Sequence, residues 1–366
     1  MMTNPSILCT NCRRPYPEVG VSHRCQSCGG LFYFDSHLVF DERKIEPGLP
    51  GIWPYRHSFP LPAGAPVVSL GEGNTPLEWR EISGRRVAFK LEYQNPTGSF
   101  KDRGAAILLS LLRSHDIETA VEDSSGNAGA AFAAYASEAG IKARVFIPDS
   151  TSAPKRMQIE KYGAQVVRIM GPRSNASEAV LREAAKGICY ASHAFLPQAV
   201  AGYATAAYES VDQLGGAPGT VLTPVGQGNL LLGMLQGFQA LTHAGITDRV
   251  PVPVGVQALA CAPVWAIRRY GASGLGWVTE SPTVAEGVRV RFPLRGDTVL
   301  GMLGEFGGDM IAVDEEGIIQ GRDQLADLGF SVEPTSAIVW QALKEILGKV
   351  PDPILVLLTG AGFKSP

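Results

Sequence analysis

The sequence predicts an α/β protein whose parallel strands form sheets covered by helices on both faces. Short apolar runs alternate with helical patterns from about Val67 to the end of the chain, and glycine- or serine-rich turns follow three of these runs. Strands that alternate with helices of this length form parallel sheets. Ligands of such folds bind beyond the carboxyl ends of the strands, so the turns at 124–129, 226–229 and 359–362 are candidate binding sites.

The first half of the alternating region predicts four pairs of a strand and a helix. The strands are expected at 86–93, 119–123, 143–148 and 164–170, and the helices at 102–115, 124–140, 152–163 and 174–186. The spacing of Ile107, Leu108, Leu111 and Leu112 gives the first of these helices an apolar face. We therefore expect this helix to lie against a core.

The second half repeats the pattern. An apolar strand with its turn is expected at 220–229, a helix at 230–241, a strand at 252–258, a strand followed by a helix within 310–329, and a last strand at 353–358. No short-period repeat is present in the sequence. A chain of 366 residues is long enough for two domains and a small appendage.

Charge and hydropathy exclude several classes of partner. The formal net charge is −3 without a long run of one sign, which argues against nucleic acid or an anionic membrane as a partner. No stretch approaches the roughly 20 apolar residues that a membrane span needs. The first residues, MMTNPSILCTNC, lack the pattern of a secretory signal, so we expect a cytoplasmic protein.

Four cysteines near the start form two C-x2-C pairs separated by twelve residues: Cys9, Cys12, Cys25 and Cys28. Four thiolates at this spacing predict a structural zinc site in a zinc-ribbon-like module over 1–43. A disulfide is disfavoured in a reducing compartment, and an empty remnant of a ribbon is the other alternative.

A linker rich in proline and glycine follows at 44–65. Cys189 and Cys261 stand in apolar surroundings and are predicted to be core residues.

The stretch NPTGSFKDRG, residues 95–104, places Lys101 where a loop ends and a helix begins. The turn at Ser124, Ser125 and Asn127 opens another helix and could hold an anion, although these residues also favour an ordinary helix cap. The glycines at 226–229 suit a phosphate. Together with the hydroxyl of Thr359, these are the parts needed to bind pyridoxal phosphate through a lysine.

Seven motifs carry a family resemblance: GEGNTPL, NPTGSFKDRGA, SSGNAGA, PVGQGNLLLG, TVAEGV, VEPTSA and LTGAGFK. In this order they are similar to those of threonine synthase and its relatives, which are pyridoxal-phosphate enzymes of the tryptophan-synthase-β type (fold type II). The resemblance runs from about Val67 to Lys364. It implies a two-domain fold with parallel or mixed sheets, a small mobile domain at 101–198, a large domain from 66–100 and 199–366, and the cofactor in the cleft between them.

The resemblance also implies residue roles. Lys101 forms the Schiff base with pyridoxal 5'-phosphate and moves protons, and Asn127 binds the ring hydroxyl. Thr359 meets the ring nitrogen, while Ser124 and Ser125 hold the substrate. The cofactor phosphate is bound by Gly226, Gln227, Gly228 and Asn229. Members of the group are commonly homodimers, and we expect a homodimer here.

The chain departs from the threonine synthase pattern at two positions. Ala128 stands where many members carry threonine, and the arginine that grips the substrate phosphate is replaced by Ala199 or a neighbour. A dianionic leaving group needs fixed positive charge. Lys155 and Arg156 could supply it, or could form a solvated helix face. His193 is a further substitute or proton carrier, or else a structural histidine.

The resulting hypothesis is a threonine-synthase-like lyase that acts on a small amino acid, with O-phosphohomoserine as the first candidate. A rival enzyme of the same group would catalyse β-replacement on phosphoserine, as cysteate synthase does, or deaminate serine or threonine. A non-catalytic protein that binds pyridoxal phosphate is a third alternative. The sequence of the cysteine module shows no patch of aromatic and basic residues, which argues against a nucleic-acid role for it.

Overall fold

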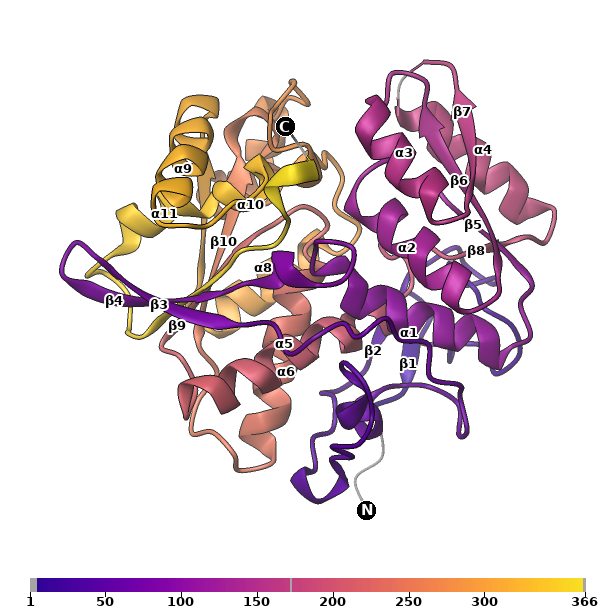
Figure 1. Ribbon diagram of the computed structural model, residues 1–366, viewed down its shortest axis with the longest axis horizontal. Helices are drawn as coiled ribbons and strands as arrows, with labels where there is room; N and C mark the ends of the chain where they lie inside the picture. The colour runs from indigo at the N-terminus through magenta and orange to yellow at the C-terminus, as the bar shows by residue number, and fades with distance from the viewer. Residues whose placement is uncertain (1–4, 172, 365–366) are drawn as a thin grey trace. The chain divides into compact units, whose positions relative to one another are not determined.

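A computed structural model describes residues 5–171 and 173–364, and the chain divides into two compact units (Figure 1). Unit 1 combines Met1–Gly73 with Lys101–Gly202, and unit 2 combines Asn74–Phe100 with Tyr203–Pro366. The cysteine module and the connector that follows it therefore group with the segment that begins at Lys101. Both units contain parallel strands and helices, so the predicted α/β class is confirmed.

Unit 1 has a four-stranded parallel sheet in the order β7-β6-β5-β8. Its strands are β5 (Thr119–Glu122), β6 (Lys142–Pro148), β7 (Gln165–Ile169) and β8 (Cys189–Tyr190). Its helices are α1 (Lys101–Ser114), α2 (Asn127–Glu138), α3 (Ala153–Lys161) and α4 (Arg173–Ala185). Figure 1 shows α3 and α4 on opposite sides of this sheet, and α1 packs against α2. Both faces are thus covered, as a parallel sheet requires.

The start of unit 1 holds a small antiparallel pair, β1 (Ile7–Cys9) and β2 (Phe32–Phe34). The proline-rich connector at 44–65 contains a short 3-10 helix at Trp53–Ser58, and another, Glu42–Lys44, ends where the connector begins. Proline is tolerated in the first turn of a helix because the N–H that it lacks has no partner there. The buried indole of Trp53 donates to the carbonyl of Val68 at 3.2 Å and holds the connector in place.

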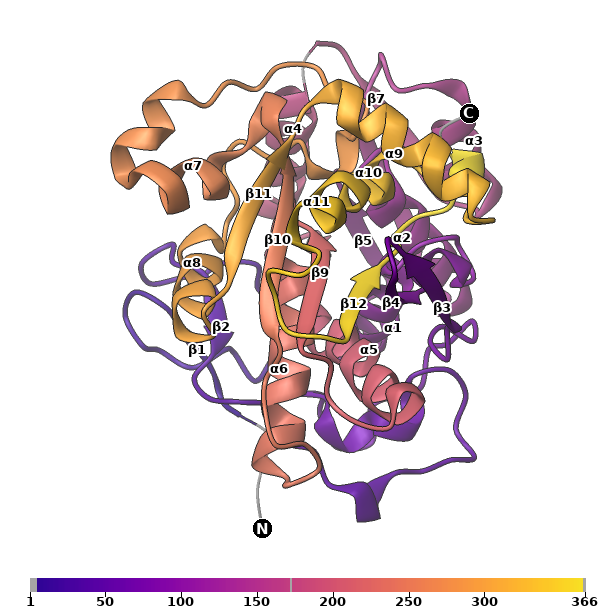
Figure 2. The same ribbon diagram turned by 90° about the vertical axis from the view of Figure 1, so that its left-hand side faces the viewer.

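Unit 2 has a six-stranded sheet in the order β11-β10-β9-β12-β4-β3 (Figure 2). The strands are β3 (Leu77–Ile82), β4 (Arg85–Lys90), β9 (Thr220–Pro224), β10 (Val252–Ala258), β11 (Asp309–Val313) and β12 (Ile354–Leu357). All neighbours are parallel except β3, which pairs antiparallel with β4 at one edge. The sheet is therefore mixed.

Seven helices accompany the sheet of unit 2 in the described residues: α5 (Gln198–Leu214), α6 (Asn229–His243), α7 (Pro263–Tyr270), α8 (Gly296–Glu305), α9 (Glu315–Asp327), α10 (Pro334–Ala337) and α11 (Val339–Ile346). Helix α5 begins in unit 1 and continues into unit 2. Apolar residues of α9, α10 and α11 join those of all six strands in one buried cluster. Helices α6 and α8 also contact β10, and α6 contacts β9.

Candidate active site

Lys101 is the first residue of α1 and is half-buried. The segment before it is held within unit 2, where the N–H of Phe100 donates to the carbonyl of Thr359 at 3.1 Å. Ser99 also forms an isolated β-bridge with Gly360. Lys101 is thus one peptide bond beyond a residue that is anchored at the end of β12.

A buried polar network fixes the loop that leads to Lys101. The hydroxyl of Thr75 donates to Glu92 Oε1 at 2.7 Å, and the amide of Asn95 donates to Glu92 Oε2 at 3.0 Å. All three side chains are at most 4% exposed. Buried polar groups are stable only when they are paired, so this network specifies one course for the loop.

A second network stands at the carboxyl end of β4. Lys90 and Glu209 form an ion pair at 2.7 Å, with side chains that are 0% and 3% exposed. Lys90 Nζ also donates to the carbonyl of Thr75 at 2.7 Å and to Gln213 Oε1 at 3.0 Å. The other oxygen of Glu209 accepts from the N–H of Asn74 at 2.9 Å. The motif GEGNTPL is therefore tied to β4 and α5 by buried charge.

Lys101 lines a pocket of unit 1 together with Glu122, Ala128 and His193. The other lining residues are apolar: Ala105, Leu108, Leu109, Ala131, Phe132 and Ala191. His193 Nδ1 lies 3.0 Å from Glu122 Oε1, and Glu122 is 1% exposed. Burial, reinforced by the charge of Asp123, raises the pKa of Glu122 well above its ordinary value.

The loop after β5 carries the residues predicted to hold substrate and ring hydroxyl. Ser124 is buried, and its hydroxyl accepts from the N–H of Gly126 at 3.3 Å. Ser125 and Asn127 are half-buried, and Asn127 begins α2. N–H groups at a helix start favour anions, which suits a substrate carboxylate.

Gly129 allows this loop to fold back on α2. A Cβ added at Gly129 would lie 1.8 Å from the carbonyl oxygen of Ser124, whereas one added at Gly126 would meet no atom within 4 Å. The contact at Gly129 is with backbone, so a side-chain rotation cannot relieve it.

We therefore expect Gly129→Ala to displace the 124–127 loop and to destabilise the protein by about 1–3 kcal/mol, the usual cost of overpacking. The matched variant Gly126→Ala should change the free energy of unfolding by less than about 1 kcal/mol, since the cap site is open. Urea denaturation of both variants measures the difference. Equal stability of the two variants would show that the backbone contact at Gly129 does not shape the loop.

In unit 2 the turn at 226–229 follows β9 and begins the fifteen-residue helix α6. Gly228 has a φ of +87°, which other residues rarely adopt. A Cβ on Gly226 would lie 2.8 Å from the carbonyl of Gly287, so bulk is excluded there as well. The side chain of Gln227 accepts from the N–H of Leu294 at 3.0 Å. Backbone N–H groups of a glycine turn at a helix start suit a phosphate, as the sequence predicts for this turn.

Thr359 follows β12, the strand next to β9, so it shares an edge of the sheet with the 226–229 turn. Its N–H donates to Ser336 Oγ at 2.8 Å. Its hydroxyl oxygen is buried and has no hydrogen-bond partner within 5–171 and 173–364. A buried polar atom without a partner is costly, and a ring nitrogen of a bound cofactor would satisfy it. The residues present therefore fit pyridoxal phosphate.

The remaining predicted residues fall in unit 1. Lys155 is half-buried on α3, and its neighbour Arg156 lies 3.6 Å from Glu160 in an ion pair. Ala199, which was predicted with its neighbours to stand in place of the arginine, is fully buried near the start of α5. Glu122 was missed by the sequence analysis. The signal was an acid pair, Glu122 and Asp123, directly at the end of an apolar strand.

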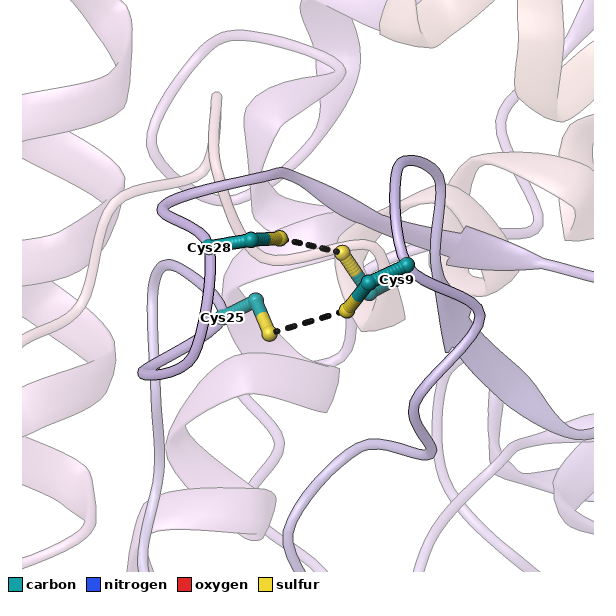
Figure 3. A group of neighbouring side chains, drawn as sticks. Cys9, Cys25 and Cys28 are labelled. Atoms are coloured by element: carbon teal, nitrogen blue, oxygen red, sulfur yellow. Dashed lines mark hydrogen bonds between the residues drawn. The ribbon is translucent and has the colours of Figure 1, made fainter.

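The four cysteines come together as predicted, with no disulfide between them (Figure 3). All four sulfur atoms lie within 4.8 Å of one another. Cys9 Sγ is 3.5 Å from Cys28 Sγ, and Cys12 Sγ is 3.6 Å from Cys25 Sγ. The backbone N–H of Cys12, acting against burial, lowers the pKa of Cys9 to about 6. Thiolates in this arrangement suit a tetrahedral zinc ion.

Comparison with known proteins identifies the class. A family model described as pyridoxal-phosphate dependent enzyme matches residues 68–360. The threonine synthase of Methanocaldococcus jannaschii is 30% identical over 375 residues, covering 98% of this chain and 92% of that protein. The threonine synthase of Synechocystis sp. is 32% identical over 322 residues, covering 85% and 82%.

Solved structures agree on the fold. A threonine deaminase from T.th. has a TM-score of 0.65 and 27% identity, covering 78% of this chain and 92% of that one. Maize serine racemase, at 22% identity, has a TM-score of 0.67 over 79% of this chain and 88% of that one, and shows the fold alone.

These findings define an enzyme of fold type II that depends on pyridoxal phosphate. The chain belongs to the pyridoxal-phosphate dependent enzyme family, and within it is a threonine-synthase-like lyase. The predicted family, fold class and enzyme class are thereby confirmed. Within 5–171 and 173–364, no helix has both the length and the apolar character that a membrane crossing demands.

Proposed function

We propose that this enzyme converts O-phosphohomoserine and water to threonine and phosphate. The observation that carries the proposal is the near full-length similarity to threonine synthases, 98% of the chain at 30% identity. The pocket lined by Lys101 and the anion-binding start of α2 suit a small amino acid with a free carboxylate. The substrate in this proposal is a small molecule, and the assembly a homodimer.

In the proposed site, Lys101 attaches the cofactor and Asn127 bonds its ring hydroxyl. The N–H groups of Gly226, Gln227, Gly228 and Asn229 hold its phosphate, and Thr359 meets its ring nitrogen. When bound, pyridoxal phosphate supplies an electron sink for carbanions formed at the substrate α-carbon.

The chain's own residues orient the substrate and move its protons. Ser124 and Ser125 bind the substrate carboxylate at the start of α2, which fixes the α-carbon near the Lys101 amine. Lys101 Nζ then takes and returns protons, since an apolar pocket disfavours the charged ammonium and leaves more of the amine free to accept a proton. The proposal assigns Lys155 to the leaving phosphate, which needs positive charge.

Phosphate release with product identification tests this function. The purified, cofactor-loaded protein should yield threonine and phosphate in equal amounts from O-phosphohomoserine. No release, with serine or threonine consumed instead, would contradict it.

A second candidate is elimination from an amino acid whose leaving group is a hydroxyl. Two observations favour it: Ala199 offers no charge where an arginine is expected, and the pocket beside Lys101 contains a buried carboxyl group, Glu122. A buried carboxyl group supplies none of the positive charge that a phosphate dianion needs. In this case serine or threonine would give ammonia and a keto acid, and phosphoserine would not react.

We propose that the cysteine cluster binds one structural zinc ion. Cys9→Ser should remove the metal, because one of four thiolates is lost, and should lower the melting temperature. The control Cys189→Ser changes a half-buried cysteine outside the cluster and should retain one zinc per chain. Elemental analysis of both proteins measures this. A gently purified wild type without metal would refute the site.

A further inference from the structure

An acid–imidazole pair lines the same pocket as Lys101 in unit 1. Glu122 ends β5, and His193 lies between β8 and α5. Their contact of 3.0 Å joins Glu122 Oε1 to His193 Nδ1. The second oxygen, Oε2, is buried without a hydrogen-bond partner among the described residues, and Glu122 lines the same pocket as Lys101.

The surroundings of Glu122 disfavour the ionised form of its carboxyl group. Most of the pocket lining is apolar, and the adjacent acid in the sequence, Asp123, accepts from the hydroxyls of Tyr190 at 2.8 Å and Ser177 at 2.5 Å. Besides His193, the positive charges that act on Glu122 are Lys101 and Arg173, which oppose the rise of its pKa.

A carboxyl and an imidazole at this distance hold one proton between them at moderate pH. The pair is then neutral overall, either as two uncharged groups or as an ion pair. When that proton is lost, the pair carries one negative charge in a poorly solvated pocket beside Lys101. Such a charge favours the protonated form of any nitrogen at Lys101.

We propose that Glu122 and His193 are positioning residues that share one proton and, through its loss, control the protonation of the Lys101 nitrogen. The inference rests on the proposed role of Lys101 as the residue that attaches the cofactor. A glutamine and a histidine would satisfy the same contact structurally. What the ionisable pair adds to that contact is a proton that it can gain or lose beside the pocket of Lys101.

The test is a pH titration of the visible absorbance of the cofactor-loaded protein. Glu122→Gln removes the negative charge, so the Lys101 nitrogen should lose its proton at a pH lower by about one unit or more. His193→Gln should move the midpoint in the same direction, because an isolated buried carboxyl stays protonated. The double variant should shift no further than either single variant, since both act through one shared proton.

The control Glu183→Gln removes a unit 1 carboxylate that pairs with Arg144 and Lys186 outside the pocket. It should leave the midpoint unchanged. If the titration midpoint of Glu122→Gln equalled that of the wild type while the visible absorbance band of the bound cofactor was intact, the inference would be overturned. The proposed function would still stand. A wild-type protein that never shows the visible absorbance band of bound cofactor would overturn the proposed function. The proposed effect of the pair on the Lys101 nitrogen would fall with it.

The shared proton has a second readout that needs no cofactor. Because the pKa of Glu122 is raised on folding, its contribution to stability is complete below the ordinary carboxyl pKa and is lost as pH rises through the raised value. From about pH 5 upward, the wild type should therefore lose more stability than Glu122→Gln. If the melting temperatures of the two proteins changed in parallel across this range, the result would contradict a proton held by the Glu122–His193 pair.

Discussion

Replacing Lys101 by alanine is expected to remove the visible absorbance of bound cofactor and to lower turnover by roughly 10⁴-fold. Alanine has no amine to attach the cofactor or to carry protons. The helix should persist, because alanine is the residue with the highest helix propensity, and Lys101 is only half-buried at the first position of α1. Absorbance and activity of the purified variant measure the loss.

The control for this experiment is Lys161→Ala, which removes an exposed lysine from the last turn of α3 in the same unit. It should keep both the absorbance and the activity. A Lys101→Ala protein that binds the cofactor with an unchanged spectrum would contradict the assignment of Lys101.

The largest expected effect on stability comes from Glu209. Glu209→Ala leaves the ammonium of Lys90 buried without its carboxylate, and breaking a buried pair in this way costs about 3–5 kcal/mol. The backbone of Asn74 also loses its acceptor. Urea denaturation should show a lower midpoint, and the 74–75 segment should exchange its amide hydrogens faster.

Two further variants separate charge from packing. The double variant Lys90→Met with Glu209→Leu removes both charges and should be more stable than Glu209→Ala alone. Glu178→Ala breaks an exposed pair with Arg182, with side chains 67% and 66% exposed, and should cost less than about 1 kcal/mol. A Glu209→Ala protein as stable as Glu178→Ala would show that the buried pair does not hold this segment.

Alternation of strands and helices was enough to predict the fold class, because each element carries its own pattern. The apolar stripe of α1 at Ile107, Leu108, Leu111 and Leu112 is buried as expected. Helix α5 was not predicted. Its residues from Ala199 to Ser210 are buried all round, so its sequence shows no polar face to mark a helical period.

Some residues of the candidate site could be predicted from the sequence, and others could not. Lys101, the 226–229 turn and Thr359 were predicted because their motifs occur together in the order that carries the family resemblance. Glu122 was not found, because an acid at the end of a strand is ordinarily a solvated residue. Its burial and its contact with His193 depend on residues 71 positions apart, which the local pattern does not reveal.

The most direct test of the account is to locate the covalent link between protein and cofactor. The loaded protein is reduced with borohydride, digested and analysed by mass spectrometry. We predict that the peptide containing Lys101 carries the added mass of the reduced cofactor. A modified lysine elsewhere, such as Lys90 or Lys155, with Lys101 unmodified, would contradict the central claim.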